Sequence, residues 1–247
     1  MIGFFDYTVV LTYMSLGFTI FGMTQSIHMR FKTAIFCLAL SGLCDMFDGK
    51  IARTKKDRSD DQKNFGIQID SLCDVICFGA FPAIICYLLG VRGFVGVGIV
   101  IFYCIAAVIR LGYFNVLEGN RQKTEGGVNK YYHGLPVTSI AVILPLTFMM
   151  EFFVTEKPFI LILHAVLLCV GILFIVDFKV KKPTNKELAM LVAVVGIAVA
   201  VIIIFTRFKL PPANRNFTKL PLMEEIGGSI DEELGDLGCS IADGTGN

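Results

Sequence analysis

Charged residues and histidines are scarce in this chain of 247 residues. Only 17% of the residues are charged, and the three histidines are too scattered to define a metal site by spacing. The eight cysteines form no CxxC pair and lie mostly inside apolar segments, as is typical of small, polarizable packing residues. We therefore expect neither a zinc site nor a disulfide framework.

Signals for nucleic-acid binding, secretion and sequence repetition are also missing. The net charge of +1 does not bear on nucleic-acid binding, but no basic stretch contains interleaved aromatic residues, so nucleic acid is not an expected partner. The first apolar run has no basic segment before it and no small-residue cleavage site, so we expect it to stay as a helix. No internal repeat of fixed period is found.

Apolar residues dominate the composition instead. They make up 55% of the chain, compared with roughly 45–50% in soluble domains, and the mean hydropathy is +0.69. Windows long enough to cross a hydrocarbon core of about 30 Å as helices cover residues 7–27, 31–49, 66–90, 93–117, 134–155, 158–176 and 187–206. The sequence predicts an all-α, polytopic transmembrane helical bundle of six to seven spans.

The chain divides into two parts of different composition. Residues 1–206 form the predicted membrane-embedded domain, because the polar interruptions between its apolar windows are short. Residues 207–247 are rich in glycine, aspartate and glutamate, which predicts a polar, acidic and weakly ordered C-terminal tail.

The basic residues predict the orientation of the bundle. They gather in the loops after the second, fourth and sixth apolar windows, as Arg53, Lys55, Lys56, Arg58, Lys63, Arg121, Lys123, Lys130, Lys179, Lys181, Lys182 and Lys186. The positive-inside rule places these loops in the cytoplasm. A seventh span would put Arg207 and Lys209 on the opposite side, against the same rule, so the number of spans stays open between six and seven.

Four aspartates lie beside or inside two of the apolar windows. Asp45 and Asp48 are three residues apart, and Asp70 and Asp74 are four apart, so each pair projects from one face of its helix. A charge within a span costs at least about 2.5–3.5 kcal/mol, and Arg53 alone cannot balance four of them. Hard oxygen ligands suit Mg²⁺ or Mn²⁺, with Ca²⁺ as a competitor. We therefore predict a site for two divalent metal ions, open to the cytoplasm.

Small residues accompany the four acids. Gly49 and Ala52 follow Asp48 on the same helix, and Gly66 lies one turn before Asp70. Small side chains let a flat, bulky group approach the backbone, although each of them alone is better explained by helix packing in a membrane.

Together these residues form a motif. It reads Asp45-x2-Asp48-Gly49-x2-Ala52-Arg53, followed by Gly66-x3-Asp70-x3-Asp74. This pattern resembles the signature of the CDP-alcohol phosphotransferase family, although the twelve residues 54–65 between its two halves are more than is usual. The resemblance implies a membrane-embedded helical bundle, usually a homodimer, that transfers a phosphatidyl-type group from a CDP-linked lipid to an alcohol and releases CMP.

The resemblance also implies roles for the motif residues. The four aspartates would hold the two metal ions, and Asp74 would also accept the proton of the acceptor hydroxyl as general base. The implied CDP-binding residues are Asp48, Gly49, Ala52, Arg53 and Gly66. Arg53 would hold phosphate, or it is a cytoplasmic topology anchor.

Three further segments resemble the phosphatidylserine synthase branch, whose acceptor is L-serine. They are "IDSLCDVICFGAFPA" (69–83), "IRLGYFNVLEG" (109–119) and "YYHGLPVTSIA" (131–141). Arg110 is the best candidate to bind the serine carboxylate, because a guanidinium fork matches a carboxylate, but it could also be a topology anchor. Asn115 would contact the amino acid or cap a helix, and His133 would shape the entrance. The chain has Tyr113 where many members carry a second arginine.

Other functions remain open from the sequence. Glycerol 3-phosphate or an inositol phosphate as acceptor would want several cations, whereas Arg110 is the only obvious intramembrane one. A divalent-cation transporter would place its site on related repeats near the midplane, and no repeat is found. A membrane protein that binds partners without catalysis is the third alternative. The leading prediction is an integral protein of the cytoplasmic membrane that uses CDP-diacylglycerol and L-serine and forms a homodimer among membrane lipids.

Overall fold

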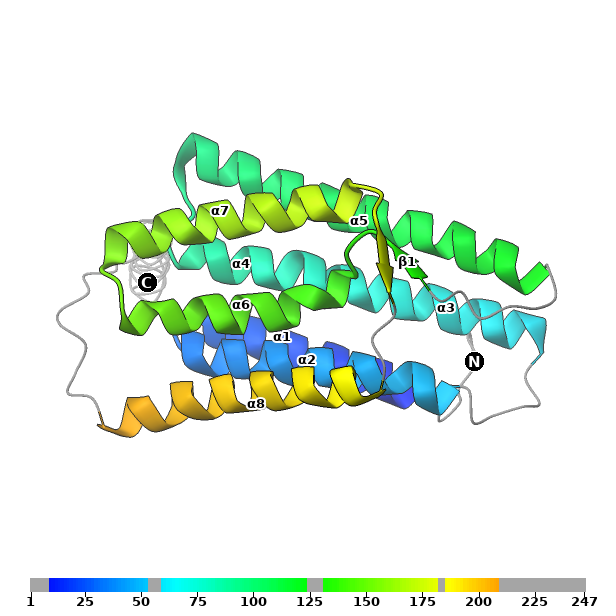
Figure 1. Ribbon diagram of the computed structural model, residues 1–247, viewed down its shortest axis with the longest axis horizontal. Coiled ribbons are helices and arrows are strands. Elements are labelled where there is room, and N and C mark those ends of the chain that lie inside the picture. The colour runs from blue at the N-terminus through cyan, green and yellow to red at the C-terminus, as the bar shows by residue number, and fades with distance from the viewer. Residues whose placement is uncertain (1–8, 53–58, 124–130, 182–184, 209–247) are drawn as a thin grey trace, which may run out of the picture. The chain divides into compact units, whose positions relative to one another are not determined.

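The computed structural model describes residues 9–52, 59–123, 131–181 and 185–208, and helices occupy most of them. In chain order these are α1 (Val10–Ile27), α2 (Phe31–Ala52), α3 (Asp60–Asp74), the π-helix η2 (Val75–Ala80), α4 (Phe81–Leu88), α5 (Gly93–Lys123), the 3-10 helix η3 (Val137–Ser139), α6 (Ile140–Met149), the 3-10 helix η4 (Met150–Phe152), α7 (Glu156–Ile175) and α8 (Asn185–Phe208). Each apolar window predicted from the sequence coincides with one helix or with a continuous series of helices (Figure 1).

The predicted helical fold is therefore confirmed, with one small addition. Strands β1 (Tyr131–His133) and β2 (Lys179–Lys181) form a two-stranded antiparallel ladder in which Tyr131 pairs with Lys181. The ladder joins the segment before η3 to the segment after α7, beside the end of α7 and the beginning of α6 (Figure 1). These two polar connections are thereby held together at one end of the helices.

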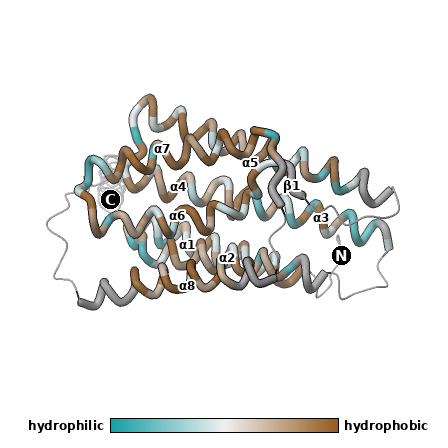
Figure 2. Tube along the Cα trace, in the orientation of Figure 1, coloured by the Kyte–Doolittle hydropathy of each residue, from teal (hydrophilic) through white to brown (hydrophobic). Residues whose placement is uncertain are grey.

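Several helices have the length and composition of membrane spans. Three helical segments in the described part of the chain are long and apolar enough to cross a membrane, namely Asp61–Leu88, Gly93–Gly119 and Glu156–Ile175. Two shorter apolar helices cover Val137–Phe152 and Val192–Ile202. Hydrophobic residues follow most of the helices, while hydrophilic residues gather toward the start of α3 (Figure 2). The composition fits a membrane protein, but the predicted number of six or seven spans is not confirmed.

The rod formed by α3, η2 and α4 is longer than a bilayer core. The segment Asp61–Leu88, which contains an apolar window long enough to span a membrane, has 28 residues. At 1.5 Å per residue this is about 42 Å, compared with about 30 Å for the hydrocarbon core. The rod begins in a capping box, because Gln62 donates its backbone N–H to Ser59 Oγ and Gln62 Oε1 accepts the Ser59 N–H, both at 3.2 Å. A polar, capped beginning favours a start outside the hydrocarbon region.

Helix α1 packs along α2 and also contacts α4. Its buried side is small and polar, with Thr12, Ser15, Thr19, Gly22 and Ser26. A Cβ atom at Gly22 would lie 2.3 Å from Phe81 Cζ and 2.8 Å from Cys37 Cβ. Only glycine allows this approach, and small residues at such contacts are typical of helix packing in membranes.

The remaining helices pack in a few close pairs. Helix α5 packs along α7, α2 along α6, and α3 against α5. The acidic tail predicted for residues 207–247 lies almost entirely outside the described residues, so it stays a prediction.

Candidate active site

Three of the four predicted aspartates come together from two helices. Asp45 lies on α2, and Asp70 and Asp74 lie one turn apart on α3. One carboxylate oxygen of each residue can be chosen so that the three oxygens lie within 4.8 Å of one another, and all three side chains are half-buried. The spacing of four residues on α3 is what directs two carboxylates to the same neighbour. We call Asp45, Asp70 and Asp74 the carboxylate trio.

Asp48 lies at the edge of the trio and is more deeply buried than its members. Its side chain is 7% exposed, and Thr12 Oγ1 of α1 donates a hydrogen bond of 3.2 Å to Asp48 Oδ2. The carboxyl groups of Asp48 and Asp70 also come within hydrogen-bonding range of each other. The four acids thus form one continuous group, but Asp48 is oriented by a hydroxyl of α1.

Thr12 was missed by the sequence reasoning. The sequence feature that could have indicated it is the spacing of hydroxyl residues on an otherwise apolar helix. Thr12, Ser15 and Thr19 are separated by three and four residues, which places them on one face. Their buried hydroxyls form a network with α2, in which Ser15 and Thr19 lie 2.7 and 3.0 Å from Ser41 Oγ. This spacing predicts a buried polar face on the helix, but it does not predict which of the four aspartates that face contacts.

Arg110 is buried at the end of the predicted fourth span. Its side chain is 5% exposed, and its Nε donates a hydrogen bond of 3.1 Å to the carbonyl of Leu135. The neighbouring Gly134 has a φ of +74°, and its N–H donates to the carbonyl of Phe178 at 2.7 Å. Arg110 thus fixes the backbone between β1 and η3. The same segment carries Thr138, whose side chain lies close to that of Asp45.

Asn115 lies next to the trio through one intermediate residue. Ser71 Oγ donates a hydrogen bond of 2.6 Å to Asn115 Oδ1, and Ser71 directly follows Asp70 in α3. This bond directs the amide NH₂ of Asn115 away from Ser71, where it can serve as a donor. Asn115 is thus linked to α3 next to Asp70, whereas Arg110 contacts the backbone at Leu135. Tyr113, which lies between them on α5, is 50% exposed.

The remaining predicted residues are less well defined. Gly66 lies on α3 one turn before Asp70 and is half-buried. Gly49 and Ala52 lie on the last turns of α2, and His133 pairs with Lys179 in the ladder, but the surroundings of these three side chains lie outside the described structure. Arg53 is itself outside the described residues. Their binding roles stay predictions.

The donor set of the trio fits divalent metal ions. It consists of carboxylate oxygens, which Mg²⁺ and Mn²⁺ prefer. Oxygens bound to one Mg²⁺ at about 2.0–2.1 Å lie up to about 4.2 Å apart, and oxygens shared by a pair of ions spread further. The limit of 4.8 Å for the trio is compatible with either arrangement.

Comparison with known proteins identifies the family. Residues 7–176, which contain the four acids together with Thr12, Arg110 and Asn115, match the family described as CDP-alcohol phosphatidyltransferase. The chain belongs to this family.

Curated relatives carry more specific names. The CDP-diacylglycerol-serine O-phosphatidyltransferase of Saccharomyces cerevisiae is 32% identical over 131 residues, which are 52% of this chain and 45% of the relative. The protein of the same name from Helicobacter pylori is 31% identical over 124 residues, 49% of this chain and 48% of the relative. The archaetidylserine synthase of Methanothermobacter thermautotrophicus is 33% identical over 129 residues, 52% of this chain and 51% of the relative. The chain thus matches about half the length of these relatives.

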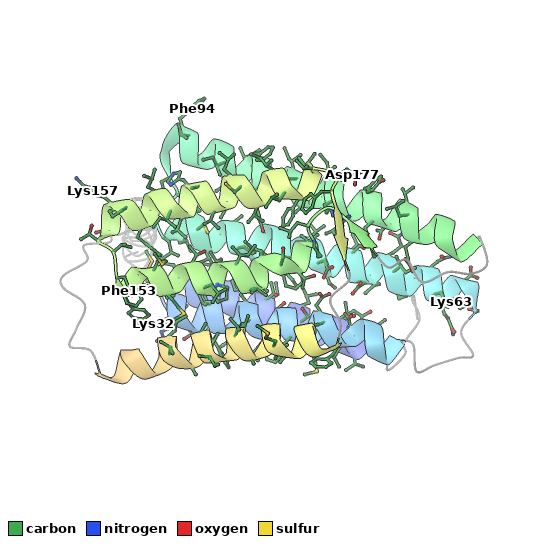
Figure 3. All side chains as sticks on the ribbon, viewed as in Figure 1. Lys32, Lys63, Phe94, Phe153, Lys157 and Asp177 are labelled. Carbon is green, nitrogen blue, oxygen red and sulfur yellow. The ribbon has the colours of Figure 1, made fainter. Side chains whose placement is uncertain are left out.

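An apolar groove lies away from the family's signature residues. It has a volume of about 470 Å³, and its lining includes the apolar residues Val95, Ile99 and Leu161 together with His164 and Lys157. Lys157, at the start of α7, and Lys63, near the start of α3, lie at opposite ends of the helices (Figure 3). The groove therefore belongs to the end remote from the polar start of α3, and its lining is mostly apolar.

We predict that Thr12→Val weakens metal binding without abolishing it. Valine has the shape of threonine but cannot donate to Asp48, and loss of a residue that orients a metal ligand typically reduces affinity 10- to 100-fold. Because the bond is long, we expect about tenfold, the lower end of that range. The measurement is a titration of free Mn²⁺ by electron paramagnetic resonance in nanodiscs. Thr24→Val is the matched control, since Thr24 lies exposed on the same helix; equal affinities of both variants and the unmodified protein would contradict the prediction.

Proposed function

We propose that the protein transfers the phosphatidyl group of CDP-diacylglycerol to L-serine, forming phosphatidylserine and CMP. The observation that carries this proposal is the carboxylate trio, in which two helices of a family member bring Asp45, Asp70 and Asp74 within 4.8 Å. The names of the relatives support serine as the acceptor.

Two divalent ions, Mg²⁺ or Mn²⁺, would be held by the trio together with Asp48. When bound, they would neutralise the pyrophosphate and stabilise the attacking and leaving oxygens. Gly49, Ala52 and Gly66 would leave room for the cytidine, and Arg53 would contact phosphate. Thr12 would keep Asp48 oriented toward the same site.

The proposed reaction exchanges one bond to phosphorus for another. Asp74 takes the proton of the serine hydroxyl, and the hydroxyl oxygen forms a bond to the phosphorus that carries the diacylglycerol. The bond from that phosphorus to the oxygen of CMP breaks, and CMP leaves with the electron pair. Asp74 then passes its proton to water, which restores the carboxylate.

Arg110 and Asn115 would select the acceptor. Both lie on α5 and are linked to the site through Leu135 and Ser71. A guanidinium whose Nε is fixed by a carbonyl has a defined plane for the serine carboxylate, and the Asn115 amide can donate a further hydrogen bond. His133, in the adjacent strand, would border the entrance. A phosphorylated acceptor would want more positive charge than Arg110 supplies.

We also propose a place in the cell for this reaction. The basic loops support an orientation in which the polar start of α3 and the active site face the cytoplasm, in the cytoplasmic membrane. Six or seven helices would span the bilayer, the tail of residues 207–247 would remain in water, and two copies would form a homodimer.

The test is CMP release by the purified protein in nanodiscs with CDP-diacylglycerol and Mn²⁺ or Mg²⁺. We expect release that depends on L-serine and on the metal, and that is much slower with glycerol 3-phosphate or an inositol phosphate. Release that depends on one of the phosphorylated acceptors instead would keep the family chemistry and overturn the proposed substrate. Transport of the metal ion without CMP release would instead favour the alternative function of a divalent-cation transporter.

A further inference from the structure

The helix that carries Asp70 and Asp74 changes its geometry immediately after Asp74. The α-helical hydrogen bonding of α3 ends there, and η2 (Val75–Ala80) continues the rod as a π-helix before α4 begins. π-helical turns are rare and are frequently found at functional sites. Asp74 is therefore the last residue before a change in helical phase.

A proline explains why one carbonyl in η2 needs a partner. In an α-helix the carbonyl of Phe78 would accept the N–H of residue 82, but that residue is Pro82, which has no N–H. Phe78 is completely buried, and a buried carbonyl without a partner is costly. In α-helical geometry the Phe78 carbonyl would therefore need a donor from outside the helix.

Tyr103 of α5 is that donor. Its hydroxyl donates a hydrogen bond of 2.6 Å to the carbonyl of Phe78, and its side chain is 0% exposed. Its ring also packs on Phe174 of α7, with ring centroids 5.6 Å apart. A single buried side chain thus joins α5 and α7 to the π-helical turn.

We propose that Tyr103 is a positioning residue for the metal site, because its hydroxyl holds the π-helical turn that directs Asp70 and Asp74 toward Asp45. A π-helical turn accommodates one residue more than an α-helical turn, so its relaxation would rotate α3 relative to α4 by about 100°. Helix α4 is fixed by buried side chains such as Phe81 and Ile85. The rotation would therefore move the carboxylates of α3.

The inference rests on the proposed metal site, and its test measures metal binding instead of transfer. Tyr103→Phe removes only the hydroxyl, and we expect the affinity for Mn²⁺, measured by electron paramagnetic resonance in nanodiscs, to fall about tenfold. Tyr87→Phe is the matched control, because Tyr87 is 39% exposed on α4. Phe174→Leu removes the ring contact and keeps the hydroxyl, so it should lower Tm and leave the affinity unchanged.

A second substitution distinguishes two roles of Tyr103. Its hydroxyl could position the carboxylates of α3, or it could only supply a hydrogen bond to the Phe78 carbonyl. Pro82→Ala offers the Phe78 carbonyl an N–H in α-helical geometry. In the double variant with Tyr103→Phe we expect Tm to recover while Mn²⁺ affinity stays low. Pro82→Ala alone retains the tyrosine, and we expect it to lower the affinity by competing for the carbonyl.

The outcomes are distinct. Unchanged Mn²⁺ affinity in Tyr103→Phe, or recovery of affinity together with Tm in the double variant, would overturn the positioning role. If Tyr103→Phe does not fold, unchanged affinity in Pro82→Ala alone overturns it. An unmodified protein that binds no Mn²⁺ refutes the metal site and the inference together, whereas Mn²⁺ binding without transfer to serine refutes the proposed reaction alone.

Discussion

The Asp74→Asn variant is expected to release CMP roughly 10²- to 10⁴-fold more slowly than the unmodified protein, the range for loss of a general acid or base. Asparagine has the size of aspartate, but its amide neither accepts a proton from the serine hydroxyl nor offers a charged oxygen to a metal ion. Asp74 lies within 4.8 Å of two other carboxylates, so both effects act at one place. The measurement is the rate of CMP release at saturating serine and CDP-diacylglycerol.

The matched control for this variant is Asp61→Asn. Asp61 lies on the same helix, α3, but is exposed, so the control repeats the chemical change away from the trio and should retain activity. A rate for Asp74→Asn within a few-fold of the control would remove Asp74 from the reaction. Thermal unfolding of both variants shows whether a lost rate reflects a lost fold.

Replacement of Arg110 by glutamine is expected to raise the KM for serine about 10- to 100-fold while the KM for CDP-diacylglycerol changes little. A hydrogen bond to a charged group contributes about 1.5–3 kcal/mol, which corresponds to that range of affinity. Arg110→Lys keeps the charge but loses the fork and the Nε–H that reaches the Leu135 carbonyl. We expect it to recover only part of the affinity.

Arg92→Gln is the matched control, because it also removes an arginine that donates hydrogen bonds to backbone carbonyls. Arg92 donates to the carbonyls of Tyr87 and Leu88 at 3.2 and 3.3 Å and plays no part in the proposed site. If Arg110→Gln instead raised the KM values of both substrates equally, or lowered only kcat, Arg110 would be a support for the segment at Gly134 and not a ligand of serine.

The helices could be predicted from the sequence because their signals are local. Apolar windows of span length report where a helix can lie in a membrane, and each of them coincides with helical structure. The spacing of Asp70 and Asp74 fixed their common face without any knowledge of the neighbouring helices. The motif that contains them also led to the family, which the comparison with known proteins confirmed.

The composition of the site depended on contacts between distant residues. Asp45 and Asp48 lie on the same face of α2, so their spacing gave no reason to expect different surroundings for them. In the structure Asp45 joins the trio, whereas Asp48 is oriented by Thr12, which is 36 residues away. The bond between Tyr103 and Phe78 likewise joins residues 25 apart. No periodicity within one helix predicts these pairs.

The amino-acid sequence by itself established the helices, their membrane character, the two acidic pairs and the family. The packing of the helices determined which carboxylates meet and which hydroxyls orient them. The physical reason is that each helix forms through backbone hydrogen bonds between residues close in the sequence. The register between helices depends instead on close contacts such as Gly22 against Phe81 and on the π-helical turn after Asp74. Those contacts exist only once the helices have packed.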